Sequence, residues 1–172
     1  MIALLTFSGP VVHAEDASSL LLTDDQIMAI KTNCLSVQSN LQRIDENDAL
    51  ARYNLAQQYN IISTKLMAPM NSRIALNKLN GVALAQTTVD FDARVVDFKA
   101  AYQQYEDAMQ QALKMNCKDQ PVSFFDTINV ARQHRSEVRQ SMTAINGLLQ
   151  QYRTQLDALP IAQTAAGGDS AS

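Results

Sequence analysis

The stretch TVDFDARVVDFKAAYQQYEDAMQQALK, residues 88–114, carries the clearest structural signal in this chain. Its apolar side chains recur every three or four residues, at Phe91, Val95, Phe98, Tyr102, Tyr105, Met109 and Ala112. This spacing gathers them into one seam along a helix face, as in helices that pack side by side. The stretch predicts a long amphipathic helix, which we expect to begin near Thr87 or Thr88 and to end near Cys117.

A second long helix is predicted upstream, starting at Thr23. Thr23 and Gln26 have the spacing of a capping box, in which two side chains satisfy the free N–H groups of the first turn. The apolar seam that follows is interrupted over residues 45–49 and then resumes in a shifted position. Pro69 is expected to kink this helix because it lacks an N–H group, and Asn80–Gly81 is expected to end it.

A third helix is predicted from Pro121 to the residue before Pro160. Proline is well tolerated in the first turn of a helix, where an N–H group has no partner in any case. The seam of this helix contains Ile128, Ala131, Arg135, Val138, Met142, Ile145, Leu149, Tyr152, Leu156 and Leu159.

These patterns predict an all-α fold, an elongated antiparallel three-helix bundle of coiled-coil-like character, with its first helix kinked at Pro69. The chain contains only five glycines and four prolines, which agrees with long helices and few loops. The alternative is a four-helix arrangement, in which Pro69 breaks the first helix fully and residues 70–80 pack as a separate element.

The N-terminal residues 1–14 resemble a signal peptide without its basic region, so we expect this chain to begin at a downstream start or to be a fragment. Val12 and Ala14 fit the small-residue pattern of a cleavage site before Glu15. The alternative is a frayed apolar terminus. Residues 15–22 are then a linker, residues 23–159 the helical bundle, and residues 160–172 a disordered tail of small residues.

Composition limits the classes of partner. The formal net charge is −3 and no block of like charge is present, so we expect no nucleic acid partner. No later stretch reaches the roughly 18 apolar residues of a membrane-spanning helix, so we expect no transmembrane segment, although peripheral membrane contact is compatible with the sequence.

Cys34 and Cys117 are the two cysteines of the chain. Two cysteines and His134 provide too few ligands at workable spacing for zinc, and nothing in the layout brings His134 to either thiol as a base. The chain rises ~70 Å from Cys34 to Gly81 if helical and returns ~67 Å through an extended 82–88 linker and the second helix. The two cysteines therefore meet at one level, and we expect a Cys34–Cys117 disulfide in an oxidising compartment. The alternative is two buried free thiols.

Arg135 occupies a seam position of the third helix where an apolar residue is expected. By the same counting, it lies level with the interrupted part of the first seam and with Tyr102 and Tyr105. We expect a polar layer that fixes helix register and that comprises Arg135, Arg132, Glu46, Asp48 and Glu106, with tyrosine stacking. The alternative is a small anionic-ligand site formed by Arg132, Arg135 and Arg139.

The opposite end of the bundle, residues 66–84, is unusually apolar. Methionine is common at adaptable binding surfaces, and this end could hold a protein partner, an apolar peptide or a membrane surface. The candidate partner surface comprises Met67, Met70, Ile74, Leu79, Val82 and Leu84. The alternative, which we favour, is a cap that covers the end of the bundle.

Three segments carry a resemblance: TNCLSVQSNLQ at 32–42, ISTKLMAPMNSRIALNKLNG at 62–81 and YQQYEDAMQQALKMNCKDQPVSFFD at 102–126. Over residues 28–155 the chain resembles a group of uncharacterised secreted two-cysteine helical proteins of small-genome, episymbiotic bacteria. The resemblance implies secretion and a two-cysteine helical layout. It implies no activity and no site residues.

The leading functional expectation is a secreted, non-enzymatic structural or interaction protein, located in the periplasm, at the cell surface or outside the cell. The alternative is a periplasmic chaperone-like protein that binds apolar clients through residues 66–84. An enzyme is not expected, because the sequence shows no nucleophile–base pair, metal cluster or phosphate-binding loop, and no cofactor is expected.

Overall fold

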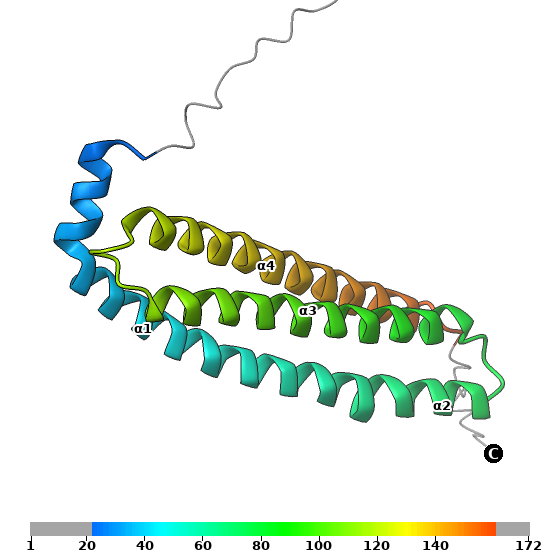
Figure 1. The fold of residues 1–172 in the computed structure, drawn as a ribbon. Helices are drawn as coiled ribbons and strands as arrows, with labels where there is room; N and C mark the ends of the chain where they lie inside the picture. The colour runs from blue at the N-terminus through cyan, green and yellow to red at the C-terminus, as the bar shows by residue number, and fades with distance from the viewer. Residues whose placement is uncertain (1–21, 161–172) are drawn as a thin grey trace, which may run out of the picture.

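The computed structural model describes residues 22–160, and these form an all-α bundle without strands. The helical elements are α1 (Asp24–Ile61), η2 (Ile62–Met67), α2 (Ala68–Leu76), α3 (Val82–Lys114) and α4 (Pro121–Asp157). Because α1, η2 and α2 follow one another without a gap, they form one continuous rod. Figure 1 shows this rod, α3 and α4 running antiparallel in turn. The predicted all-α three-helix bundle is confirmed, and the four-helix alternative is wrong.

The proposed signal peptide, residues 1–14, and the linker, apart from Leu22, lie outside the described residues. The proposed tail also lies outside them, apart from Pro160.

The core is built around α3. All seven seam residues predicted for this helix are buried, and Phe91, Phe98 and Ala112 have no exposed surface. Helix α4 packs closely along α3 and contributes buried residues at the predicted spacing, among them Ala131, Val138, Ile145 and Tyr152. The periodicity of these two helices thus specified both their type and the faces that they bury.

Helix α1 is less deeply embedded. Its two buried residues are Cys34 and Tyr59, whereas Leu41, Ile44 and Leu55 are half-buried against the core. Tyr59 anchors the rod by edge-to-face contacts with Phe91 and Phe98, at centroid distances of 6.2 and 5.5 Å. Aromatic pairs in this geometry contribute beyond their buried area.

The first turns of α1 leave the direction of the rod. Figure 1 shows them in dark blue, bent away from the long axis of the bundle. The helix begins with the predicted capping box: the Thr23 side chain accepts from the Gln26 N–H, and the Gln26 side chain accepts from the Thr23 N–H. We call residues 24–33 the α1 arm.

Pro69 does not end the first rod. The irregularity lies just before it, in the π-helical segment η2, where the Ala68 N–H bonds to the Ser63 carbonyl five residues back. A proline in a regular α-helix clashes with the carbonyl four residues earlier, and the wider π turn relieves this crowding. The sequence located the irregularity at Pro69, and the structure places it in Ile62–Met67, which ends two residues before the proline.

The rod ends earlier than predicted, at Leu76 rather than at Asn80–Gly81. Lys78 takes the left-handed conformation, with φ of 56°, and the Leu79 and Lys78 N–H groups bond to the Ile74 and Ala75 carbonyls. This is a Schellman cap, with lysine in the place that glycine usually fills. Gly81 has a negative φ, so its backbone conformation does not require glycine. Its lack of a side chain instead allows close packing against Ile74, because a Cβ atom there would lie 2.7 Å from Ile74 Cγ2.

The predicted extended linker over residues 82–88 is wrong, because α3 begins at Val82. Thr87 and Thr88 resemble helix-capping residues in the sequence. Their hydroxyls instead donate to carbonyls four residues back, those of Ala83 and Leu84, inside the helix.

Candidate functional site

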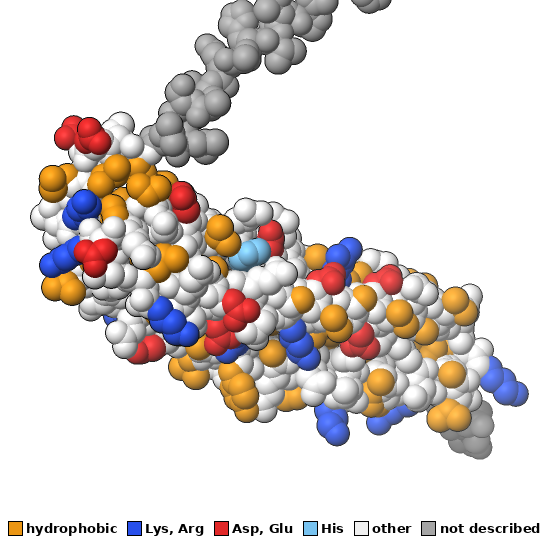
Figure 2. Space-filling view, viewed as in Figure 1, with side chains coloured by type: hydrophobic (Ala, Val, Ile, Leu, Met, Phe, Trp, Pro, Cys, Tyr) orange, Lys and Arg blue, Asp and Glu red, His pale blue; other side chains and the backbone are white. Residues whose placement is uncertain are grey.

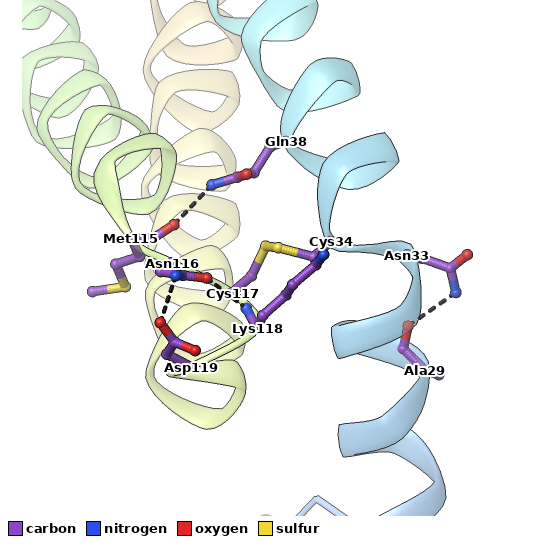
Figure 3. The surroundings of a disulfide bond; sticks show 9 residues. All are labelled: Ala29, Asn33, Cys34, Gln38, Met115, Asn116, Cys117, Lys118 and Asp119. Carbon is purple, nitrogen blue, oxygen red and sulfur yellow. Dashed lines mark hydrogen bonds between the residues drawn. A yellow bond between two sulfur atoms is a disulfide. The ribbon is translucent and has the colours of Figure 1, made fainter.

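The disulfide corner joins the base of the α1 arm to the connection between α3 and α4. Cys34 and Cys117 form a disulfide with a Cα–Cα distance of 5.6 Å, and both residues are buried. Figure 3 shows the bond, with Gln38 beside it donating from Nε2 to the Met115 carbonyl at 2.7 Å. The bond thus crosses between α1 and the α3–α4 corner, as the counting of helical rise predicted.

The two asparagines that precede the cysteines have local structural roles. The Asn116 side chain accepts from the Lys118 N–H at 3.1 Å and donates to Asp119, which shapes the tight corner after α3 (Figure 3). The Asn33 amide donates to the Ala29 carbonyl one turn back. Asn116 therefore shapes the turn that carries Cys117, and Asn33 bonds within the arm just before Cys34.

A polar layer crosses the middle of the bundle, centred on Asp48 of α1. The Asp48 carboxylate accepts from the Tyr105 hydroxyl at 2.7 Å and pairs with the Arg135 guanidinium at 3.1 Å. The Asp48 carbonyl accepts from the Tyr102 hydroxyl. All three helices of the bundle therefore meet at one residue, and the interruption of the α1 seam at this height is the place where a carboxylate faces inward.

A second ion pair extends the layer along α1 and α3. Both terminal nitrogens of Arg52 donate to the Glu106 carboxylate. The central carbon of the Arg52 guanidinium lies 4.8 Å from the centre of the Tyr102 ring. Arginine suits this position because its planar fork matches a carboxylate while its face stacks on an aromatic ring. Gln110 adds a hydrogen bond of 2.7 Å to Asp45.

The tyrosines of this layer are strongly held in their neutral form. Burial, with the nearby Asp48 charge, raises the pKa of Tyr102 to about 12. Burial and the hydrogen bond to Asp48 raise the pKa of Tyr105 as well. Burial also raises the pKa of Asp45, against the opposing effect of the Gln110 hydrogen bond. Burial therefore favours the uncharged forms of Tyr102, Tyr105 and Asp45.

Two of the residues expected in this layer lie outside it. Glu46 is exposed and accepts a hydrogen bond from Gln42 of its own helix. Arg132 is exposed and donates to Asn129, and Arg139 is also exposed, so the three arginines of the alternative anion site do not converge. Both misplacements have one cause, because matching heights along a bundle does not specify which way each side chain points.

Arg52 belongs to the layer but was not among the residues selected from the sequence. A signal was present, because Arg52 follows Asp45 and Asp48 by seven and four residues on the same helix. Residues at these spacings share a helix face, so Arg52 was a candidate for the same layer.

The apolar end divides into core and surface. Met67, Ile74 and Leu84 are buried, Met70 and Leu79 are half-buried, and Val82 is 76% exposed. The buried members act as a cap on the core, in agreement with the cap alternative for those three residues. Tyr152 secures this end by donating to Asn71, whose amide in turn donates to Thr88.

The half-buried Met70 and Leu79 line a groove, together with the buried Ile74. These side chains and those of Leu156 and Leu159, near the end of α4, surround a hollow of about 430 Å³, with Arg73 and Asp157 among its polar neighbours. We call this hollow the end groove. The prediction missed the α4 residues of this site, because their seam spacing made them appear as ordinary core positions.

Charge is evenly distributed over the visible face of the molecule, where Figure 2 shows basic and acidic side chains interspersed.

Within residues 22–160, no group of three or more metal-binding side chains comes together. No helix in the described part of the chain combines the length and apolar character required to cross a membrane.

Comparison with models of known protein families, with curated proteins and with solved structures finds no match for this chain. Its function is therefore inferred from its own residues.

Proposed function

We propose that this protein is a secreted, non-enzymatic interaction protein that binds a protein partner through the end groove. The observation that carries the proposal is the contrast between the two ends of the rod. One end is tied by the disulfide, whereas the other leaves Met70 and Leu79 half-buried beside an apolar hollow. The chain thus combines a disulfide-linked helical bundle with an apolar groove at the opposite end.

The end groove has the chemistry of a peptide-binding recess. Its lining is predominantly apolar, with a cation and an anion, Arg73 and Asp157, available to orient a partner. Ligand recesses commonly combine an apolar floor with a few placed polar groups. Methionine, here Met70, adapts its side chain to partners of different shape.

Export is part of the proposal. The Cys34–Cys117 disulfide is compatible with an oxidising extracellular location, since such bonds persist outside the reducing cytosol. The apolar residues 1–14 and the small residues before Glu15 support a cleaved export signal. The periplasm, the cell surface and the external medium all fit these features.

The test compares two leucine-to-aspartate variants in quantitative pull-downs from the native cell envelope and medium. Leu79→Asp places a charge in the end groove, whereas Leu76→Asp places the same charge three residues earlier, at a side chain that is 82% exposed and does not line the groove. Binding of the partner should fall at least tenfold for Leu79→Asp and stay near wild type for Leu76→Asp. Equal binding by both variants, each shown to be folded by circular dichroism, would exclude the end groove.

A chaperone-like role is the second candidate. Three apolar side chains of residues 66–84 are largely exposed, Leu66 at 60%, Leu76 at 82% and Val82 at 76%, and they would add to the contact with an unfolded client. Light scattering of a heat-denatured client protein tests this role. Suppression of aggregation near an equimolar ratio would support the chaperone-like role. Unchanged aggregation at a tenfold excess of this protein would exclude that role.

A further inference from the structure

A second apolar groove lies between α1 and α4, near the disulfide corner. It consists of two adjacent hollows of about 210 and 150 Å³, and Leu41, Ile128 and Arg132 line both. The larger hollow is also lined by Ile30 of the α1 arm and by Phe125. Helices α1 and α4 make few contacts with each other, and the hollows between them have half-buried Ile30 and Leu41 and buried Ile128 in their walls. We call this feature the α1–α4 groove.

Arg132 gives the groove a cation at its rim. Its neighbour Arg135 is already paired with Asp48 at 3.1 Å. Arg132 donates to the uncharged side chain of Asn129, and within the described residues no carboxylate lies within ion-pairing distance of it. An exposed guanidinium above an apolar floor is complementary to a ligand with an apolar body and an anionic head.

The dimensions favour a thin ligand. Two small hollows in series do not match the broad recess that receives a whole helix, in which several side chains insert along one face. On α4 the lining runs from Phe124 to Arg135, eleven residues apart, so the groove extends over ~16 Å along this helix. That length is comparable with an extended medium-chain acyl group.

We propose that the α1–α4 groove binds the carboxylate of a free, medium-chain fatty acid at Arg132, with the acyl chain on the floor formed by Leu41 and Ile128. The disulfide maintains this site, because Cys34 ties the base of the α1 arm beside α4 and the arm provides Ile30 as part of the wall. Figure 2 shows hydrophobic side chains grouped at the end of the molecule where α1 begins.

Isothermal titration of the oxidised full-length protein with laurate, below the micelle concentration, tests the site. We expect saturable binding near one equivalent, about tenfold weaker for Arg132→Glu, in which a charge-assisted hydrogen bond is lost. Arg132→Lys should stay close to wild type. The matched control is Arg139→Glu, which carries the same charge change at an exposed position of α4 outside the groove and should leave binding unchanged.

Dodecyltrimethylammonium has the same chain length with the opposite charge, and it should bind more tightly to Arg132→Glu than to wild type. The proposal is overturned if wild type shows no saturable laurate binding, or if Arg132→Glu and Arg139→Glu weaken binding equally. It is also overturned if the protein binds phosphatidylglycerol vesicles but not monomeric laurate, since the recognised group is then a membrane surface.

Discussion

Asp48 is the residue on which the register of the three helices depends. It accepts hydrogen bonds from α3 and α4 through its carboxylate, and its carbonyl accepts another from α3. A half-buried carboxylate that serves several donors leaves each of them without a partner when it is removed.

Asp48→Ala should lower the free energy of unfolding by about 1–3 kcal/mol, because the buried Tyr105 hydroxyl and the Arg135 guanidinium lose their acceptor. Glu46→Ala is the matched control. Glu46 is exposed two residues away on the same helix, and its loss should change stability by less than about 0.5 kcal/mol. Urea unfolding followed by circular dichroism measures both, and equal effects would contradict the role assigned to Asp48.

The buried tyrosines predict a loss of stability in alkali. The folded protein raises the pKa of Tyr102 from its ordinary value of 10.0 to about 12, so it retains a proton that the unfolded chain releases. Stability is fully present below pH 10 and falls as pH rises from 10 to about 12. The pKa of Tyr105 is also raised, so Tyr105→Phe should flatten this fall. Urea unfolding at intervals from pH 8 to pH 11.5 would show it, and an unchanged slope would refute the assignment.

At the scale of elements, apolar spacing predicted helix type and buried face well, because one repeated pattern determines both. The ends were harder to predict. Thr87 resembles a helix cap, and Asn80–Gly81 resembles a helix stop, but backbone hydrogen bonding placed the stop at Leu76 and a left-handed lysine at residue 78. Local signals of this kind are ambiguous when neighbouring elements can use the same residues differently.

Gly81 provides a test of the turn between α2 and α3. Gly81→Ala should destabilise the protein by about 1–3 kcal/mol, because the new Cβ atom would lie 2.7 Å from Ile74 Cγ2, a branched atom of a buried side chain. Gly147→Ala, in α4, meets no atom within 4 Å and should instead stabilise the protein by about 0.5–1 kcal/mol. Thermal unfolding distinguishes the two. A neutral Gly81→Ala variant would show that the turn is looser than described.

At the scale of the whole molecule, the rod is clamped at one end. The disulfide closes a loop with a sequence separation of 83 residues, for which chain entropy gives at most ~4.5 kcal/mol of stabilisation. Helix α1 depends on this clamp more than the others, since Cys34 and Tyr59 are its two buried residues.

The double variant Cys34→Ser with Cys117→Ser should lose about 2–4 kcal/mol of stability. Amide hydrogen exchange should rise first in residues 24–44 and last in the centre of α3, because the clamp holds the arm whereas burial holds α3. Uniform acceleration over the whole chain would contradict this order. Mass spectra of the unreduced wild-type protein should show no free thiol.

The sequence anticipated the candidate sites only in part. Counting along the chain paired the two cysteines and brought Arg135 level with Asp48, although it treated residues 82–88 as an extended linker and the structure has them as the first turns of α3. The end groove required more. Leu156 and Leu159 become groove residues through the early end of α2 and the turn that follows it, and neither is visible in a pattern of apolar spacing.

Photo-crosslinking from single positions in the oxidised protein tests the proposed binding site most directly. A photoreactive residue at Leu79, in the end groove, should give one discrete partner adduct in the native cell, and Arg73→Glu should weaken it. The same residue at Leu76, exposed outside the groove, should give none. Adducts of equal yield from both positions, or an adduct from Leu76 alone, would contradict the end groove as the site of partner binding.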